Sequence, residues 1–167
     1  LHGEHAIGAG DVKRVVVRMH KRRLLPHVQR MAESALDAKF SLPYAIARAL
    51  VDGKVSLQHF ENEAWTQPDI RTVMKCITTE GHSDDTNDYG AEVVVELASG
   101  KSVSKVVPMP LGFGPAAPLP DDMLRSKFVD CASRALPEPQ SIALFELLQR
   151  LESLKDVAEM TAKAVRS

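Results

Sequence analysis

The amino-acid sequence predicts an α+β fold: a mostly antiparallel sheet of about four strands, with helices packed on it and a helical segment at the C-terminal end. Apolar and other side chains alternate in residues 12–20, which is typical of a strand with one well-buried face. A second alternating stretch, residues 92–107, contains Ser99-Gly100 and predicts a hairpin. From Asp121 onward, the apolar residues recur with a helical period instead.

A buried helix is predicted over residues 41–53. Ser41 is a suitable N-cap, and Pro43 falls in the first turn, where its missing N–H costs nothing. The helix has almost no polar face, so we expect it to be buried nearly all round. Gly53 follows at the point where a left-handed C-terminal cap favours glycine.

Helix breakers and periodicity place the remaining elements. Gln67-Pro68-Asp69 marks the start of a short helix, which runs into a strand within residues 69–80. Residues 81–90 predict a polar loop, and residues 108–120 an irregular linker. Three amphipathic helices are expected after the linker, on these apolar residues: Leu124, Phe128 and Ala135; then Ile142, Phe145, Leu148 and Leu151; then Val157, Met160 and Ala164.

Composition limits the classes of function. The 167 residues are 44% apolar and 26% charged, which suits one globular domain with an ordinary core. Lys plus Arg is 21 and Asp plus Glu is 22, so the chain lacks the basic field of a nucleic-acid-binding protein. Its longest apolar runs are only about five residues, against ~20 for a membrane span. With no charged and apolar leader at the start, we expect a cytoplasmic protein.

The cysteines and histidines form no metal-binding pattern. Cys76 and Cys131 lie far apart and neither belongs to a CxxC motif, so we expect two free, buried thiols. The chain contains six histidines, but none is paired with another at i, i+4 on a predicted helix. We expect these histidines on the surface.

Two loops match ligand-binding motifs only in part. Residues 85–96 follow some positions of an EF-hand, but Tyr89 occupies a ligand position and cannot ligate calcium well. Residues 112–117 have the spacing of a dinucleotide fingerprint, but Pro115 interrupts them and no helix follows directly. We therefore expect a solvated turn and a linker, with no metal and no cofactor.

Two basic segments lie on or at the end of predicted strands. Lys21–Arg23 ends the first strand, and this run is either a solvated edge or a contact for an anion or a partner. The return strand of the hairpin carries Lys101 and Lys105, and it predicts an exposed edge or a partner surface. An alternative function is therefore a non-catalytic binding or dimerisation module.

Residues 39–44 form the strongest candidate functional site. Lys39 and Ser41 lie at the N-terminus of an apolar helix, where free N–H groups and partial positive charge favour an anion such as a carboxylate. Tyr44 adds a hydroxyl on an otherwise apolar turn, which could transfer a proton. The alternative is that Ser41 is only the helix cap and Tyr44 is a core residue bonded to a carbonyl.

The same segment resembles the MmgE/PrpD family, whose members include 2-methylcitrate dehydratase, cis-aconitate decarboxylase and iminodisuccinate epimerase. The more specific match is DAKFSLPYAIA at residues 37–47, followed by Asp52-Gly53. Weaker matches occur in the family's order at residues 11–17, 92–100 and 112–128. The residues before Tyr44 lack the Arg-Asp-His type of sequence found in the dehydratases proper, so the resemblance is to the broader family.

The resemblance implies that residues 1–167 are a C-terminal α+β domain, with a helical N-terminal domain absent from this chain and the active site between the two. It implies a homodimeric, cofactor-independent lyase or isomerase that dehydrates, decarboxylates or epimerises a small polycarboxylate, foremost a 2-methylcitrate dehydratase-like enzyme. Tyr44 would be the catalytic acid or base, with Lys39 and Ser41 as substrate contacts. The isolated domain would be inactive, because the other catalytic residues lie in the helical domain.

Overall fold

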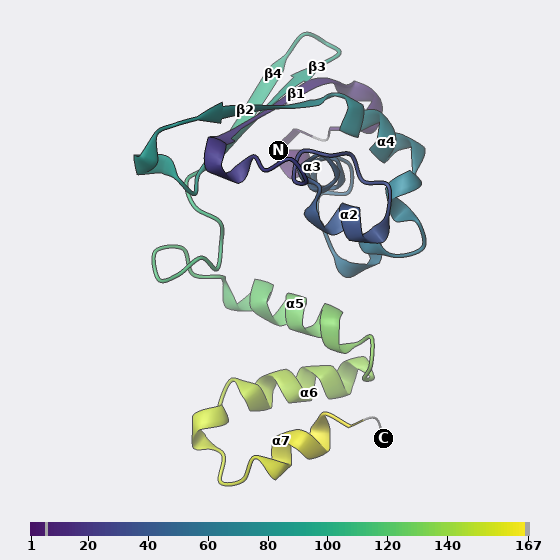
Figure 1. Ribbon diagram of the computed structural model, residues 1–167. Coiled ribbons are helices and arrows are strands. Elements are labelled where there is room, and N and C mark those ends of the chain that lie inside the picture. Colours follow the sequence, from purple (N-terminus) through teal and green to yellow (C-terminus); the bar gives the residue numbers. More distant parts are fainter. Residues whose placement is uncertain (6, 166–167) are drawn as a thin grey trace. The chain divides into compact units, whose positions relative to one another are not determined.

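The computed structural model describes residues 1–5 and 7–165, with residue 87 described for its backbone alone. The chain divides into two compact units, Leu1–Pro110 and Leu111–Ser167. The first unit, called unit 1 below, contains the sheet and the candidate site at residues 39–44 (Figure 1). The second, unit 2, is helical.

Four strands form one sheet in the described part of unit 1: β1 (Val12–His20), β2 (Ile77–His82), β3 (Ala91–Leu97) and β4 (Ser102–Val107). Their order is β2-β1-β3-β4, with β1 parallel to β2 and antiparallel to β3, which is antiparallel to β4. The predicted α+β class is confirmed, but the sheet is mixed. Helices connect β1 to β2, and such a crossover allows parallel pairing.

Helices cover one face of this sheet (Figure 1). They are α2 (Ala35–Phe40), α3 (Leu42–Val51) and α4 (Pro68–Lys75), and a further short helix, α1 (His2–His5), lies near the start of the chain. Helix α2 was not predicted. It forms because Ser34 caps it by accepting a hydrogen bond from Asp37 N, and it ends at Ser41, where the predicted helix α3 begins.

The core of unit 1 lies between the sheet and these helices. Val15 and Val17 of β1 are completely or almost completely buried, as the alternation of residues 12–20 predicted. Burying each such side chain contributes roughly 1.5–3 kcal/mol to folding. The helices supply the following buried residues to the same cluster: Ala38, Tyr44, Ala47, Leu50, Ile70, Val73 and Met74.

The other face of the sheet carries charged residues that pair across strands. Arg18 Nε lies 2.7 Å from Glu80 Oε2 of β2, and Arg18 Nη1 lies 2.9 Å from Glu92 Oε2 of β3. Arg14 Nη1 lies 3.8 Å from Glu96 Oε1. Each pair sits directly opposite in the strand register. Because these side chains are about a third to a half exposed, each pair contributes little to stability.

Unit 2 consists of α5 (Asp121–Ala132), α6 (Glu138–Leu148) and α7 (Ala158–Lys163). The rings of Phe128 and Phe145 join α5 to α6 at a centroid distance of 5.4 Å. Leu144 and Leu147 are buried on α6, whereas Leu151, predicted on its apolar face, is 45% exposed. Helix α6 ends at Leu148, so Leu151 lies beyond it in the 3-10 turn Leu151–Ser153 and does not continue its apolar stripe. No described helix of the chain is long and apolar enough to cross a membrane.

The two cysteines are free but differ in exposure. Cys76 is half-buried, and its Sγ lies 3.5 Å from the carbonyl oxygen of Thr72. Cys131 on α5 is exposed, so the prediction of a buried thiol is wrong there. The weak packing of α5, which buries none of its residues, accounts for the difference.

Gly53, just after α3, is expected to be intolerant of any side chain. Its φ is +73°, and a Cβ atom there would lie 2.7 Å from His2 Cδ2. We expect Gly53→Ala to lower the free energy of unfolding by about 1–2 kcal/mol, measured by thermal unfolding with circular dichroism. Gly10→Ala is the control, because a Cβ at Gly10 meets nothing within 4 Å. Equal stability of the two variants would contradict the prediction.

Candidate functional site

Ser41 connects α2 to α3 and is almost completely buried. Its Oγ accepts a hydrogen bond from Tyr44 N at 3.2 Å, which makes it the N-cap of α3 as predicted. The same hydroxyl donates to the carbonyl oxygen of Arg30 at 2.6 Å. Ser41 therefore joins the loop before α2 to the first turn of α3.

The first turn of α3 has its N–H groups in use. Leu42 N donates to the carbonyl oxygen of Val28 at 2.8 Å, Pro43 has no N–H, and Tyr44 N donates to Ser41. An anion at this terminus would have to displace one of these bonds. Lys39, exposed in the last turn of α2, is the group of this segment that is open to an anionic ligand.

Tyr44 is completely enclosed by the chain, with 0% of its surface exposed. Its hydroxyl donates to the carbonyl oxygen of His59 and accepts a hydrogen bond from Arg48 Nε at 3.0 Å. The ring lies edge-on to Phe60, with 6.0 Å between the centroids. The structure thus gives Tyr44 a carbonyl partner, and it separates this interior hydroxyl from the exposed Lys39.

Arg48 is a buried cation, 2% exposed, one helical turn after Tyr44. Besides Tyr44, it donates from Nη1 to Asp52 Oδ2 and to Gln67 Oε1, both at 2.9 Å, and from Nη2 to the carbonyl oxygen of Ala64 at 2.6 Å. The Asp52 carboxylate balances its charge. A buried guanidinium is stable only with this degree of pairing, because an unpaired charge inside a protein is very costly.

His59 completes the cluster. It is 7% exposed, and its Nδ1 accepts a hydrogen bond from Ser56 N at 3.0 Å. The neutral ring therefore carries its proton on Nε2, which lies 3.7 Å from Asp52 Oδ2. Sequence reasoning placed the histidines on the surface, and for His59 that prediction is wrong.

Sequence reasoning missed Arg48, Asp52 and His59. One signal was available: Arg48 is the single charged residue within an otherwise apolar helix, with Tyr44 four residues before it and Asp52 four after it. That spacing places all three on one helical face. The contribution of His59 had no such signal, because His59 lies outside α3, in the 3-10 turn Leu57–Phe60.

A second cluster lies where the parallel strands β1 and β2 end. His20 is 1% exposed, contrary to the surface prediction, with Nε2 3.2 Å from Asp85 Oδ1 and Nδ1 3.4 Å from Asp88 Oδ1. Arg22 pairs with Asp85, and Arg23 Nε donates to the carbonyl oxygen of Asp88 at 2.6 Å. The basic run 21–23 thus meets an acidic loop of its own chain. No group of three His, Cys, Asp or Glu among the described residues is placed to hold a metal ion.

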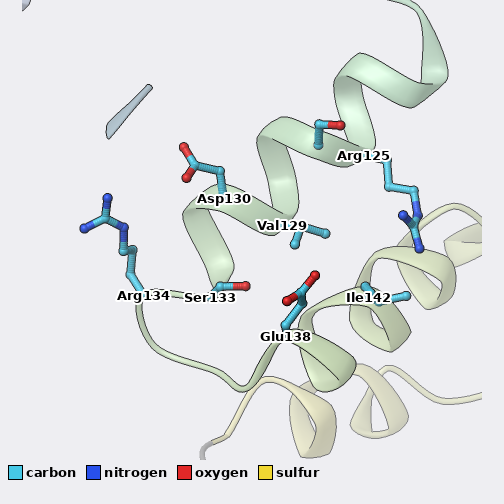
Figure 2. Close-up of a pocket in the computed structure, with 8 residues that line it drawn as sticks. Arg125, Val129, Asp130, Ser133, Arg134, Glu138 and Ile142 are labelled. Carbon is cyan, nitrogen blue, oxygen red and sulfur yellow. The ribbon is translucent and has the colours of Figure 1, made fainter. Parts of the chain in front are cut away.

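An open cavity of about 500 Å³ lies within unit 2, between α5 and α6. Figure 2 shows Arg125 of α5 extending toward α6, and Glu138 of α6 pointing toward α5. Asp130 and Arg134 also belong to its lining, so the cavity carries both signs of charge. None of the residues predicted from the sequence as functional lines it.

The amino-acid sequence of this chain matches a known family of proteins. The MmgE/PrpD C-terminal domain matches residues 1–151. The chain is 31% identical over 135 residues to the cis-aconitate decarboxylase-like protein oryM of Aspergillus oryzae, an alignment that covers 77% of this chain and 27% of that protein. It is 24% identical over 160 residues to mouse cis-aconitate decarboxylase, covering 92% of this chain and 31% of that enzyme.

Both relatives are much longer than this chain, which spans less than a third of their length. The family match extends beyond residues 37–53 to the whole of unit 1 and much of unit 2. By the match of its first 151 residues to the family's C-terminal domain, the chain belongs to the MmgE/PrpD family.

Proposed function

We propose that this chain is the C-terminal domain of a cofactor-independent lyase or isomerase that acts on a small polycarboxylate. The observation that carries the proposal is the family match over residues 1–151, together with two relatives named as cis-aconitate decarboxylase or decarboxylase-like. Decarboxylation of cis-aconitate is the first reaction to test, and dehydration of 2-methylcitrate is the second. Such chemistry needs proton transfer beside a carboxylate and cations that hold the remaining carboxylates.

The surface around Lys39 supports a second domain as partner. Leu36 and Phe40, four residues apart on the same helix, are 65% and 57% exposed. Large apolar side chains gathered at a surface favour contact with another protein surface. We propose that a helical domain covers this region, so that Lys39 lies at the boundary between the two domains.

The experiment compares the complete enzyme, meaning a protein that joins this domain to its helical domain, with the 167-residue chain alone. Each is incubated with cis-aconitate, 2-methylcitrate and a panel of other small polycarboxylates, and consumption is followed by chromatography. We expect turnover by the complete enzyme, undiminished by EDTA, and none by the chain alone. Failure of the complete enzyme to consume any of these acids would contradict the proposal.

Lys39→Gln in the complete enzyme is expected to raise KM at least tenfold with kcat changed less than threefold. The reason is the loss of one charge-assisted hydrogen bond to a substrate carboxylate, worth roughly 1.5–3 kcal/mol. Steady-state kinetics give both constants, with the acid that the complete enzyme consumes in the preceding experiment as substrate. Lys54→Gln is the control, since Lys54 is also exposed but follows α3. If the KM of Lys39→Gln equals that of the control, Lys39 does not contact the substrate.

A second candidate function, dimerisation, is favoured by the edge strand β4. Its outer edge has no partner strand in the described sheet, and Val106 and Val107 are 59% and 43% exposed. An exposed apolar edge is suited to pairing with a second copy. We expect the complete enzyme to be a dimer by light scattering, and Val106→Lys to shift it toward the monomer. A dimer unaffected by this substitution would place the interface elsewhere.

A further inference from the structure

Residues Ser56–Gln67, called the strap below, lie over the Tyr44 hydroxyl. They contain two short 3-10 turns, Leu57–Phe60 and Ala64–Thr66. Three of their oxygen atoms accept hydrogen bonds from α3. The carbonyl of His59 accepts from Tyr44, and the carbonyl of Ala64 and the side chain of Gln67 accept from Arg48. Two side chains of α3 therefore hold the strap in place.

The contacts of Arg48 divide into two sets. Its bonds to Tyr44 and Asp52 join residues four apart on, or at the end of, the same helix. Its bonds to Ala64 and Gln67 reach across to the strap. If the strap moves away, the first set stays intact, so the guanidinium keeps a counter-charge and the Tyr44 oxygen keeps a donor. Only the second set is lost.

The strap is held together by its own short turns, in which backbone hydrogen bonds such as His59 N to Ser56 O and Thr66 N to Glu63 O keep it folded as a unit. Between its two turns, Asn62 and Glu63 have φ angles of +48° and +55°, and neither is glycine. Left-handed backbone at such residues is strained and persists only where the surroundings hold it. Phe60 and Trp65, which attach the strap to the core, are only partly buried. The internal bonds keep the strap folded, whereas the bonds from Arg48 and Tyr44 attach it to α3.

We propose that the strap is a cover over Tyr44, and that Arg48 is the positioning residue that holds the cover closed and orients the hydroxyl. This inference rests on the proposed function, in which Tyr44 meets a substrate. When the strap lifts, the His59 carbonyl leaves and the Tyr44 O–H becomes available to donate to a substrate oxygen. Arg48 Nε still donates to the hydroxyl oxygen and so fixes the direction of that O–H.

Hydrogen exchange on the full 167-residue chain tests the cover. Arg48→Lys keeps the charge but replaces a planar fork by one ammonium, which cannot serve all four acceptors. We expect the strap amides to exchange at least tenfold faster, with amides of β1 and β3 within twofold of wild type. Arg71→Lys is the matched control, because Arg71 donates to a different loop, at the carbonyl oxygen of Ala32. Its strap rates should stay within twofold.

Tyrosine nitration by tetranitromethane supplies a second readout. The chain contains two tyrosines, the buried Tyr44 and the exposed Tyr89, so Tyr89 is an internal control. Arg48→Lys should nitrate Tyr44 at least tenfold faster, with the Tyr89 rate unchanged. Gln67→Ala removes one strap contact at an exposed residue and should raise the Tyr44 rate about threefold. If Arg48→Lys does not fold, the nitration rate of Gln67→Ala tests the proposal in its place.

The proposal is overturned if Tyr44 nitration stays within twofold of wild type, or if strap and sheet amides speed up by the same factor. In the complete enzyme, Arg48→Lys should lower kcat at least tenfold with KM within threefold, since Lys39 is untouched. Exchange and nitration need no turnover. If the enzyme does not act on polycarboxylates, the exchange and nitration rates should still change as expected. If the strap is not a cover, those rates stay unchanged, but the unmodified enzyme still turns over its substrate.

Discussion

Tyr44→Phe in the complete enzyme is expected to lower kcat/KM at least 100-fold, because a positioned acid or base typically contributes 10²–10⁴-fold to the rate. The substitution keeps the ring and its contact with Phe60 and removes only the hydroxyl. Steady-state kinetics on the polycarboxylate substrate measure the effect. Tyr89→Phe is the control, since Tyr89 lies on the exposed loop before β3.

The same variant also has a structural cost that must be separated from catalysis. Without the hydroxyl, the buried Arg48 Nε loses an acceptor and the His59 carbonyl loses a donor. We expect a loss of about 1–3 kcal/mol in the free energy of unfolding. Kinetics are therefore measured well below the melting temperature of the variant. A folded Tyr44→Phe enzyme with kcat/KM within threefold of wild type would leave Tyr44 only the role of holding the strap.

Arg48→Met is expected to have the largest effect on stability, lowering the free energy of unfolding by about 3 kcal/mol. Removing one partner of a buried ion pair typically costs 3–5 kcal/mol, and the lower value applies because Asp52 is 30% exposed and keeps some hydration. The loss includes the acceptors on Ala64 and Gln67, which Met cannot satisfy. Urea unfolding followed by circular dichroism gives the change.

Arg18→Met is the matched control for this measurement. Arg18 also contacts two carboxylates, but its side chain is 46% exposed and water replaces the lost partners. We expect the free energy of unfolding to change much less than in Arg48→Met. If Arg48→Met and Arg18→Met lower the free energy of unfolding equally, the burial of Arg48 does not account for its contribution to stability.

Elements with a strong local pattern could be predicted from the sequence. The alternation in residues 12–20 gave β1 its bounds and its buried face, and Ser41 and Pro43 marked the start of α3. The parallel pairing of β1 with β2 could not be predicted in this way. It depends on how the intervening helices pack, and no residue in either strand encodes that arrangement by itself.

In the candidate site too, a contact between residues close in sequence could be predicted, and contacts between distant residues could not. Ser41 was predicted as a cap because its bond to Tyr44 N spans three residues. The bonds from Tyr44 to His59 and from Arg48 to Ala64 span 15 and 16 residues and pass through a segment without periodicity. The burial of His20 likewise depends on Asp85 and Asp88, which reach it only after β2 has paired with β1. Contacts of this kind arise from the tertiary fold.

The cross-strand ion pairs of β1 have a consequence for how the sheet assembles. Arg18 faces Glu92 and Arg14 faces Glu96 in the native register. A slip of β3 by one residue would turn both glutamates toward the apolar core, where a carboxylate is strongly disfavoured. Mispaired intermediates would therefore be short-lived, even though each pair adds little to the final stability. These surface charges select the correct alignment while the chain is folding.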